Sequence, residues 1–117
     1  MNAVLRHDPD SGIIYVSPKE GSGDIRWTQS IRSMLQLAAQ TGSKKALLDF
    51  RGAQITATAS EIVTVVKSWP DDFVISSITD ESNYEHESFV ETASMNRGKM
   101  FRTFEDAEAA ENWLKSC

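Results

Sequence analysis

The stretch that decides the fold reads KKALLDFRG and covers residues 44–52. Its centre, residues 46–48, is continuously apolar rather than alternating, which is typical of a strand covered on both faces. Asp49 stands near the end of this run. Residues 53–60 (AQITATAS) follow as a small, hydroxyl-rich loop that opens a helix. We therefore expect a buried strand over 45–50, with any site of the protein gathered at the junction that follows it.

A hairpin and a helix are predicted before this strand. Residues 2–7 and 13–17 contain short β-forming runs, and the turn between them combines a proline, which fixes φ, with a glycine, which tolerates positive φ. Asp24 is a good N-cap residue, and the apolar residues after it recur at spacings of three and four. This pattern predicts a helix that begins after Asp24 and ends at Gly42.

The alternation of helices and strands continues to the end of the sequence. The helix after the central strand is capped by Thr58, which forms a capping-box pattern with Glu61, or by Ser60. The later elements are predicted from apolar spacing and from capping and breaking residues. The helix after the central strand ends at Pro70, and a strand follows over 73–78. A helix opened by Ser82 and Glu85 then ends at Gly98, and it is followed by a strand over 99–102 and a final helix capped by Thr103 and Asp106.

This order predicts an α/β protein, because short strands that alternate with helices form a mostly parallel sheet with right-handed crossovers. We predict one domain over residues 1–117. It contains a single, mostly parallel sheet of about five strands with an N-terminal antiparallel hairpin, and four helices.

The composition limits the kinds of partner. The 117 residues carry a formal net charge of -5 at pH 7. A phosphate-backbone interface needs a basic face, so we predict no nucleic-acid partner. No stretch approaches the ~20 apolar residues of a membrane span, so we predict no membrane insertion. The single cysteine, Cys117, permits no internal disulfide, and the first residues do not resemble a signal peptide, so we expect a cytoplasmic location.

Residues that carry chemistry are scattered along the sequence. The two histidines, His7 and His86, stand alone, and the spacings of nucleophile elbows, phosphate loops and dinucleotide fingerprints are absent. We therefore predict no catalytic residues, no metal site and no cofactor. The acidic residues are expected to form a solvated surface or, as the alternative, an electrostatic face for a basic protein partner. They gather at Asp71, Asp72, Asp80, Glu81, Glu85, Glu87 and Glu91.

The candidate site residues lie at and after the end of the central strand. Ligands of open α/β sheets bind outside the carboxyl ends of strands, so Asp49 is a candidate for orienting a ligand or a loop. The alternative for Asp49 is a local acceptor for loop N–H groups or an ion-pair partner for Arg51. Thr56, Thr58 and Ser60 complete the set, as candidate phosphoacceptors or as part of a partner-binding loop.

Two segments resemble the SpoIIAA-like branch of the STAS superfamily. One is the strand–loop–helix segment 45–66. The other is the ending 95–114, in which a short strand runs into FRTF and an acidic, alanine-rich helix closes on Trp and Leu. The element order matches over nearly the whole chain, and the resemblance implies a five-stranded sheet flanked by four helices. It also implies two kinds of relative. Anti-sigma factor antagonists bind a kinase-like partner and are switched by phosphorylation of a serine at the start of the second helix. Members related to CRAL-TRIO domains are associated with apolar or lipid ligands.

The antagonist pattern is Leu-Asp-hydrophobic, a loop, and then Asp-Ser-Ser-Gly. Residues 48–50 (LDF) match its first part. Counting without a gap aligns the phosphorylated serine with Ala59, and one inserted residue aligns it with Ser60. The loop here has neither the Asp nor the Gly of the motif, and Glu61 adds a negative charge beside Ser60. The alternative role for Ser60 is a plain helix N-cap.

The leading hypothesis is a non-enzymatic STAS-like domain that acts by binding a protein partner or a second copy of itself. The alternative is a carrier of a small apolar or lipid-like ligand, held in a pocket near the 49–60 loop. An enzyme would instead show a deep pocket at the loops 49–60 and 79–84, with a titratable residue of strongly shifted pKa. The aromatic and methionine residues that motivate the carrier equally suit an ordinary core. They are Trp27, Met34, Trp69, Phe73, Phe89, Met95, Met100 and Phe101.

Overall fold

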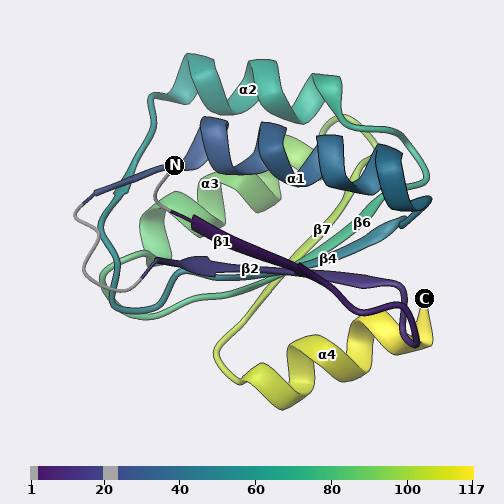
Figure 1. Ribbon diagram of the computed structural model, residues 1–117. Helices are drawn as coiled ribbons and strands as arrows, with labels where there is room; N and C mark the ends of the chain where they lie inside the picture. The colour runs from purple at the N-terminus through teal and green to yellow at the C-terminus, as the bar shows by residue number, and fades with distance from the viewer. Residues whose placement is uncertain (1–2, 20–23) are drawn as a thin grey trace.

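The computed structural model of the protein describes residues 3–19 and 24–117 (Figure 1). Within these residues the chain forms seven strands and four helices. In chain order they are β1 (Ala3–His7), β2 (Ile13–Pro18), β3 (Ile25–Arg26), α1 (Trp27–Thr41), β4 (Lys45–Asp49), β5 (Ile55–Thr56), α2 (Ala59–Ser68), β6 (Val74–Ile78), α3 (Tyr84–Met95), β7 (Met100–Phe104) and α4 (Ala107–Ser116).

The main sheet has the order β1-β2-β4-β6-β7. β1 and β2 pair in antiparallel fashion, and every later pair in this sheet is parallel. The α/β fold predicted from the sequence is therefore confirmed, including the N-terminal antiparallel hairpin, the five-stranded sheet and the four helices. The register places Asp49 beside Ile78 and Ile78 beside Phe104, so the carboxyl ends of β4, β6 and β7 lie level at one edge of the sheet.

The helices form two layers around this sheet. Helices α1, α2 and α3 lie over one face, and α4 covers the other face alone (Figure 1). The apolar run in β4 serves both layers: Leu48 belongs to the core beneath α1, α2 and α3, while Leu47 packs with Ala110 and Leu114 of α4. Burial on both faces is the physical reason why the run is continuous rather than alternating.

The start of α1 differs from the prediction. Asp24 does not cap the helix. Residues 25 and 26 instead form β3, which pairs in parallel with β5 as a separate two-stranded sheet, and α1 begins at Trp27. The buried Ile25 donates its N–H to the carbonyl oxygen of Gln54 at 2.7 Å. Burial and strand pairing at Ile25 therefore outweigh the capping preference of Asp24.

The start of α3 also differs from the prediction, and so does the burial of two of its residues. The hydroxyl of Ser82 donates to Asp80, and α3 begins at Tyr84, so the expected capping box of Ser82 and Glu85 does not form. Phe89, one of the aromatic residues that suit a core, is exposed, and Glu87, expected at the solvated surface, is buried. Most of the aromatic and methionine residues of the carrier hypothesis lie in the core, including both tryptophans at 27 and 69. Among the helices that the structure describes, none has the length and apolar character needed to cross a membrane.

Candidate functional site

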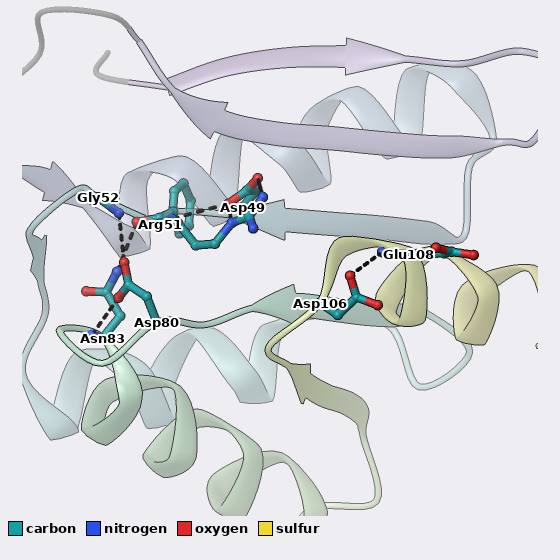
Figure 2. Close-up of polar contacts among 8 residues, drawn as sticks. Asp49, Arg51, Gly52, Asp80, Asn83, Asp106 and Glu108 are labelled. Atoms are coloured by element: carbon teal, nitrogen blue, oxygen red, sulfur yellow. Dashed lines mark hydrogen bonds and ion pairs between the residues drawn. The ribbon is translucent and has the colours of Figure 1, made fainter.

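The candidate site begins where β4 ends. Arg51 folds back on Asp49, and its Nε and one terminal nitrogen each lie 2.9 Å from a carboxylate oxygen of Asp49 (Figure 2). The backbone N–H of Arg51 also donates to Asp49, at 3.2 Å. The Asp49 carboxylate raises the pKa of Arg51 through these hydrogen bonds, so the guanidinium stays charged. Asp49 thus acts both as a local acceptor for the loop and as the partner of Arg51.

A second carboxylate joins this turn to the loop after β6. One oxygen of Asp80 accepts the N–H of Gly52 at 2.8 Å, and the other accepts the hydroxyl of Ser82 at 2.8 Å and the N–H of Asn83 at 3.1 Å. These donors, the Gly52 N–H first, hold the pKa of Asp80 below its usual value despite some burial. The ionised carboxylate is therefore the form that stabilises the connection.

Asn83 completes the connection between the two loops, which we call the loop bridge (Gly52, Asp80 and Asn83). The Asn83 side chain is buried, and its amide nitrogen donates to the carbonyl oxygens of Phe50 at 2.9 Å and Ala53 at 3.3 Å. Figure 2 shows Asp80 and Asn83 facing the turn at Gly52. Gly52 adopts a φ of 78°, a left-handed conformation that favours glycine. The bridge fixes the turn after β4 against the loop after β6.

An acidic hollow lies beside the loop bridge, with a volume of about 650 Å³. Four carboxylates face one guanidinium there, and that guanidinium is already paired with Asp49. Tyr84, at the first turn of α3, is 59% exposed and offers an aromatic surface at the same place. The hollow therefore suits a positively charged group that can also lie against a ring. Its lining residues are Arg51, Thr79, Asp80, Glu81, Ser82, Tyr84, Glu85 and Glu105.

The structure separates the predicted loop into two places. Arg51 lines the acidic hollow, and its partner Asp49 lies beside it. Thr56 lies in β5, the short strand between β4 and α2, and it does not line the acidic hollow. Thr58 is the N-cap of α2 and forms the predicted capping box with Glu61: its hydroxyl oxygen accepts the Glu61 N–H at 3.2 Å, and its N–H donates to Glu61 at 3.1 Å. Ser60 is exposed in the first turn of α2. The five predicted residues thus do not form one cluster.

The side chains with strongly shifted pKa values do not line the acidic hollow. Burial lowers the pKa of His86 to about 4 and raises the pKa of Glu87 to about 7. Both belong to α3 and face the layer between the helices and the sheet, where His86 contacts the ring of Trp27 and Glu87 accepts the hydroxyl of Ser77. Over the ranges 3–19 and 24–117, no group of three or more His, Cys, Asp or Glu side chains is arranged to hold a metal ion. The hollow offers charge and shape for binding.

Asn83, Tyr84 and Glu105 are not among the site residues predicted from the sequence. The polar connector after the 73–78 strand could have indicated them, because adjacent parallel strands bring their carboxyl ends, and the loops that follow, to one edge of a sheet. Using that signal requires the knowledge that β4, β6 and β7 are adjacent, and residue patterns alone do not give strand order. Comparison of the chain with protein-family models, with curated proteins and with solved structures found no match in any of the three.

Proposed function

We propose that this chain is a non-enzymatic, STAS-like domain that binds a basic segment of a partner protein at the acidic hollow. The observation that carries the proposal is the excess of carboxylates around Arg51, together with the exposed ring of Tyr84. Lysine and arginine side chains fit such a surface, because carboxylates attract the charge while an aromatic ring accepts the cation on its face. The loop bridge supports the proposal further, since a surface held in place loses less entropy on binding.

A binding experiment with charge reversal tests this proposal. The protein is immobilised and titrated with a lysine- and arginine-rich peptide at low and at physiological salt, first as wild type and then as the double variant Glu81→Lys/Glu85→Lys. We expect saturable binding to the wild type and at least tenfold weaker binding to the double variant. Glu108→Lys, on α4 and outside the hollow, is a control for charge reversal with half the charge change of the double variant, and it should bind as the wild type does. Equal affinity in all three proteins would contradict the proposal.

The same variants address the identity of the partner. Proteins captured from an extract of the source cells by the wild type and by Glu108→Lys, but not by Glu81→Lys/Glu85→Lys, are candidates for the partner. Sedimentation of the purified chain shows whether the partner is a second copy. A dimer that persists in the double variant would mean that self-association uses another surface.

Regulation by phosphorylation at the start of α2 belongs to the same proposal. Ser60 is exposed, and a phosphate there would lie near the positive end of the helix dipole. Glu61 opposes it with a negative charge in the same turn. Incubation with cell extract and ATP, followed by mass spectrometry, tests Thr56, Thr58 and Ser60. Unmodified peptides, under conditions that phosphorylate a known antagonist, would remove regulation from the proposal and leave the binding surface in place.

A second candidate function is the carriage of a small apolar ligand. A groove of about 330 Å³, with both apolar and charged lining residues, lies between α4 and the β1–β2 side of the sheet, and Asp49 is among its lining residues. The aliphatic side chains of Val4, Leu47 and Ile78 line it, with the ring of Tyr15. Native mass spectrometry of the protein from several hosts tests this function. A copurified mass that disappears in Leu47→Glu would support it, and a mass of the chain alone from every host would count against it.

A further inference from the structure

A second hollow lies away from the acidic one, where β3 and β5 meet the starts of α1 and α2. Its volume is about 470 Å³. We call it the arginine hollow, and all six of its lining residues are polar: Arg26, Thr28, Gln29, Arg32, Thr56 and Glu61. It shares no lining residue with the acidic hollow. Its residues come from four elements, so the fold, and not one local segment, brings them together.

The small sheet of β3 and β5 positions the hollow. The two strands are parallel, and Arg26 lies directly beside Thr56 in the register. Ile25 anchors this pairing, because its side chain is fully buried and its N–H donates to the carbonyl oxygen of Gln54. Directly paired residues of neighbouring strands project to the same face of a sheet. The Arg26 guanidinium and the Thr56 hydroxyl are thus held on one side.

The two arginines of this hollow have no hydrogen-bond or ion-pair partner among residues 3–19 and 24–117. The chain's four other arginines differ in this respect. Arg51 pairs with Asp49, and Arg97 donates to a backbone carbonyl. The remaining two lie over aromatic rings, Arg6 over Tyr15 and Arg102 over Phe104.

Glu61, the carboxylate of the hollow, is already engaged. One of its oxygens accepts the N–H of Thr58 in the capping box of α2, and this bond is the main reason why the pKa of Glu61 is lowered. The charges of Arg26 and Arg32 lower it further without a direct contact. One carboxylate therefore faces two guanidinium groups, and the hollow keeps a net positive charge within a chain of net charge -5.

We propose that the arginine hollow binds a phosphate monoester dianion. Two guanidinium groups match the two charges of the dianion, and their N–H forks match its oxygens. The Thr28 and Thr56 hydroxyls and the Gln29 amide add uncharged donors at the same place. The hollow is larger than a bare phosphate ion, which leaves room for the organic group that carries the phosphate. This binding is independent of the partner surface at the acidic hollow.

The test is a titration followed by NMR of ¹⁵N-labelled protein, with inorganic phosphate and with phenyl phosphate as probes. Sodium chloride at equal ionic strength is the reference. We expect saturable shifts confined to the amides of residues 25–33 and 55–62, with phenyl phosphate binding at least as tightly as inorganic phosphate. Affinity should rise between pH 5.5 and 7.5, because the second proton of phosphate leaves near pH 6 while arginine stays charged.

Four variants separate a specific phosphate site from general charge attraction. Arg32→Gln should weaken binding at least tenfold, and Arg26→Gln should do the same if it keeps the native spectrum. Glu61→Gln removes the opposing carboxylate and should tighten binding severalfold. Lys67→Gln, which removes a charge from the end of α2 outside the hollow, should leave affinity unchanged.

Two results would overturn the inference. One is a set of NMR shifts with sodium chloride equal to those with phosphate. The other is an equal loss of phosphate affinity in Arg32→Gln and Lys67→Gln. The partner-binding proposal is judged separately, because Glu81→Lys/Glu85→Lys should leave phosphate binding in place. A double variant that loses peptide binding but keeps phosphate binding would support both statements.

Discussion

The buried carboxyl of Glu87 makes the stability of this protein depend on pH. Only 1% of the residue is exposed. One of its oxygens accepts the hydroxyl of Ser77 at 2.7 Å, and the other has no hydrogen-bond partner among the described residues. Burial is the largest cause of the rise in the Glu87 pKa from 4.5 to about 7, and the charges of Asp80 and Glu91 add to it. The folded protein therefore holds this proton more tightly than the unfolded chain does.

The sign and size of the effect follow from this difference. Below pH 4.5 Glu87 is protonated in both states and contributes no penalty. As the pH rises from 4.5 to 7, the unfolded chain loses the proton first, so the free energy of unfolding falls, and it levels off above pH 7. The pKa values of Glu87 in the unfolded and folded states differ by about 2.5, which corresponds to roughly 3 kcal/mol in the free energy of unfolding at 1.36 kcal/mol per pH unit. This energy is an upper bound, because a folded protein relaxes around a buried charge.

The variant Glu87→Gln removes this titration while keeping the shape of the side chain. At pH 8.5 we expect the variant to be more stable than the wild type by roughly 1–3 kcal/mol, and at pH 4 we expect no such gain. Urea denaturation followed by circular dichroism at pH 4, 5.5, 7 and 8.5 measures the difference. Glu85→Gln, on the exposed side of α3, is the matched control and should change stability by less than about 0.5 kcal/mol at every pH.

His86 adds a second, opposite slope. Burial lowers its pKa from 6.5 to about 4, so its contribution to stability is lost as the pH falls from 6.5 to 4. Between pH 4.5 and 6.5 the slopes of His86 and Glu87 oppose each other in the wild type, and Glu87→Gln should leave the His86 slope alone. A stability difference between Glu87→Gln and wild type that stays constant from pH 4 to 8.5 would contradict a raised pKa of Glu87 in the folded protein, because it would mean that Glu87 titrates alike in both states.

Three further predictions concern the loops around the candidate site, and each is read from urea denaturation midpoints. Thr58→Ala should cost about 1 kcal/mol through loss of the capping box, whereas Ser60→Ala should cost less than about 0.5 kcal/mol; equal costs would show that Thr58 is not the cap. Asn83→Ala should cost about 1–3 kcal/mol, because two backbone carbonyls lose a buried donor; a change within experimental error would argue against the loop bridge. Gly52→Ala should cost about 1–2 kcal/mol from its positive φ, and an unchanged midpoint would contradict the left-handed turn.

The fold was predictable because its signals are local or periodic. The continuous apolar run at Leu47 and Leu48 indicates a strand covered on both faces, and the packing of these two residues confirms it. The capping box of Thr58 and Glu61 depends on residues three apart, and it forms as predicted. Gly42 ends α1 in the left-handed conformation, with its N–H donating to a carbonyl of the last turn.

The errors occur where distant segments compete with local preference. Asp24 has the right chemistry for a cap, but the pairing of Ile25 with Ile55 moves the helix start by a few residues. The burial of two α3 residues was also mistaken, because hydrophobicity alone favours burial of Phe89 over Glu87. The hydroxyl of Ser77 on β6 accommodates the carboxyl of Glu87, and no pattern within the helix sequence reveals that donor.

The acidic hollow adjoins the junction chosen from the sequence, but most of its lining residues come from later in the chain. The end of β4 was chosen because parallel sheets bind ligands at the carboxyl ends of their strands, and Asp49 and Arg51 lie beside the acidic hollow there. The partners of that turn come from residues about 30 positions later in the chain, since Asp80 and Asn83 reach it only through the adjacency of β4 and β6. Such contacts depend on strand order, which the sequence pattern leaves open.

The loop bridge also determines how this edge of the molecule moves. Because the Gly52 amide, the Asp80 carboxylate and the Asn83 amide share one set of hydrogen bonds, neither loop can open without breaking contacts of the other. The amide protons of both loops should therefore exchange with solvent in a single cooperative opening. Any molecule that displaces the segment after β6 will thereby loosen the segment after β4. Two connections that are far apart in the chain thus behave as one mechanical unit.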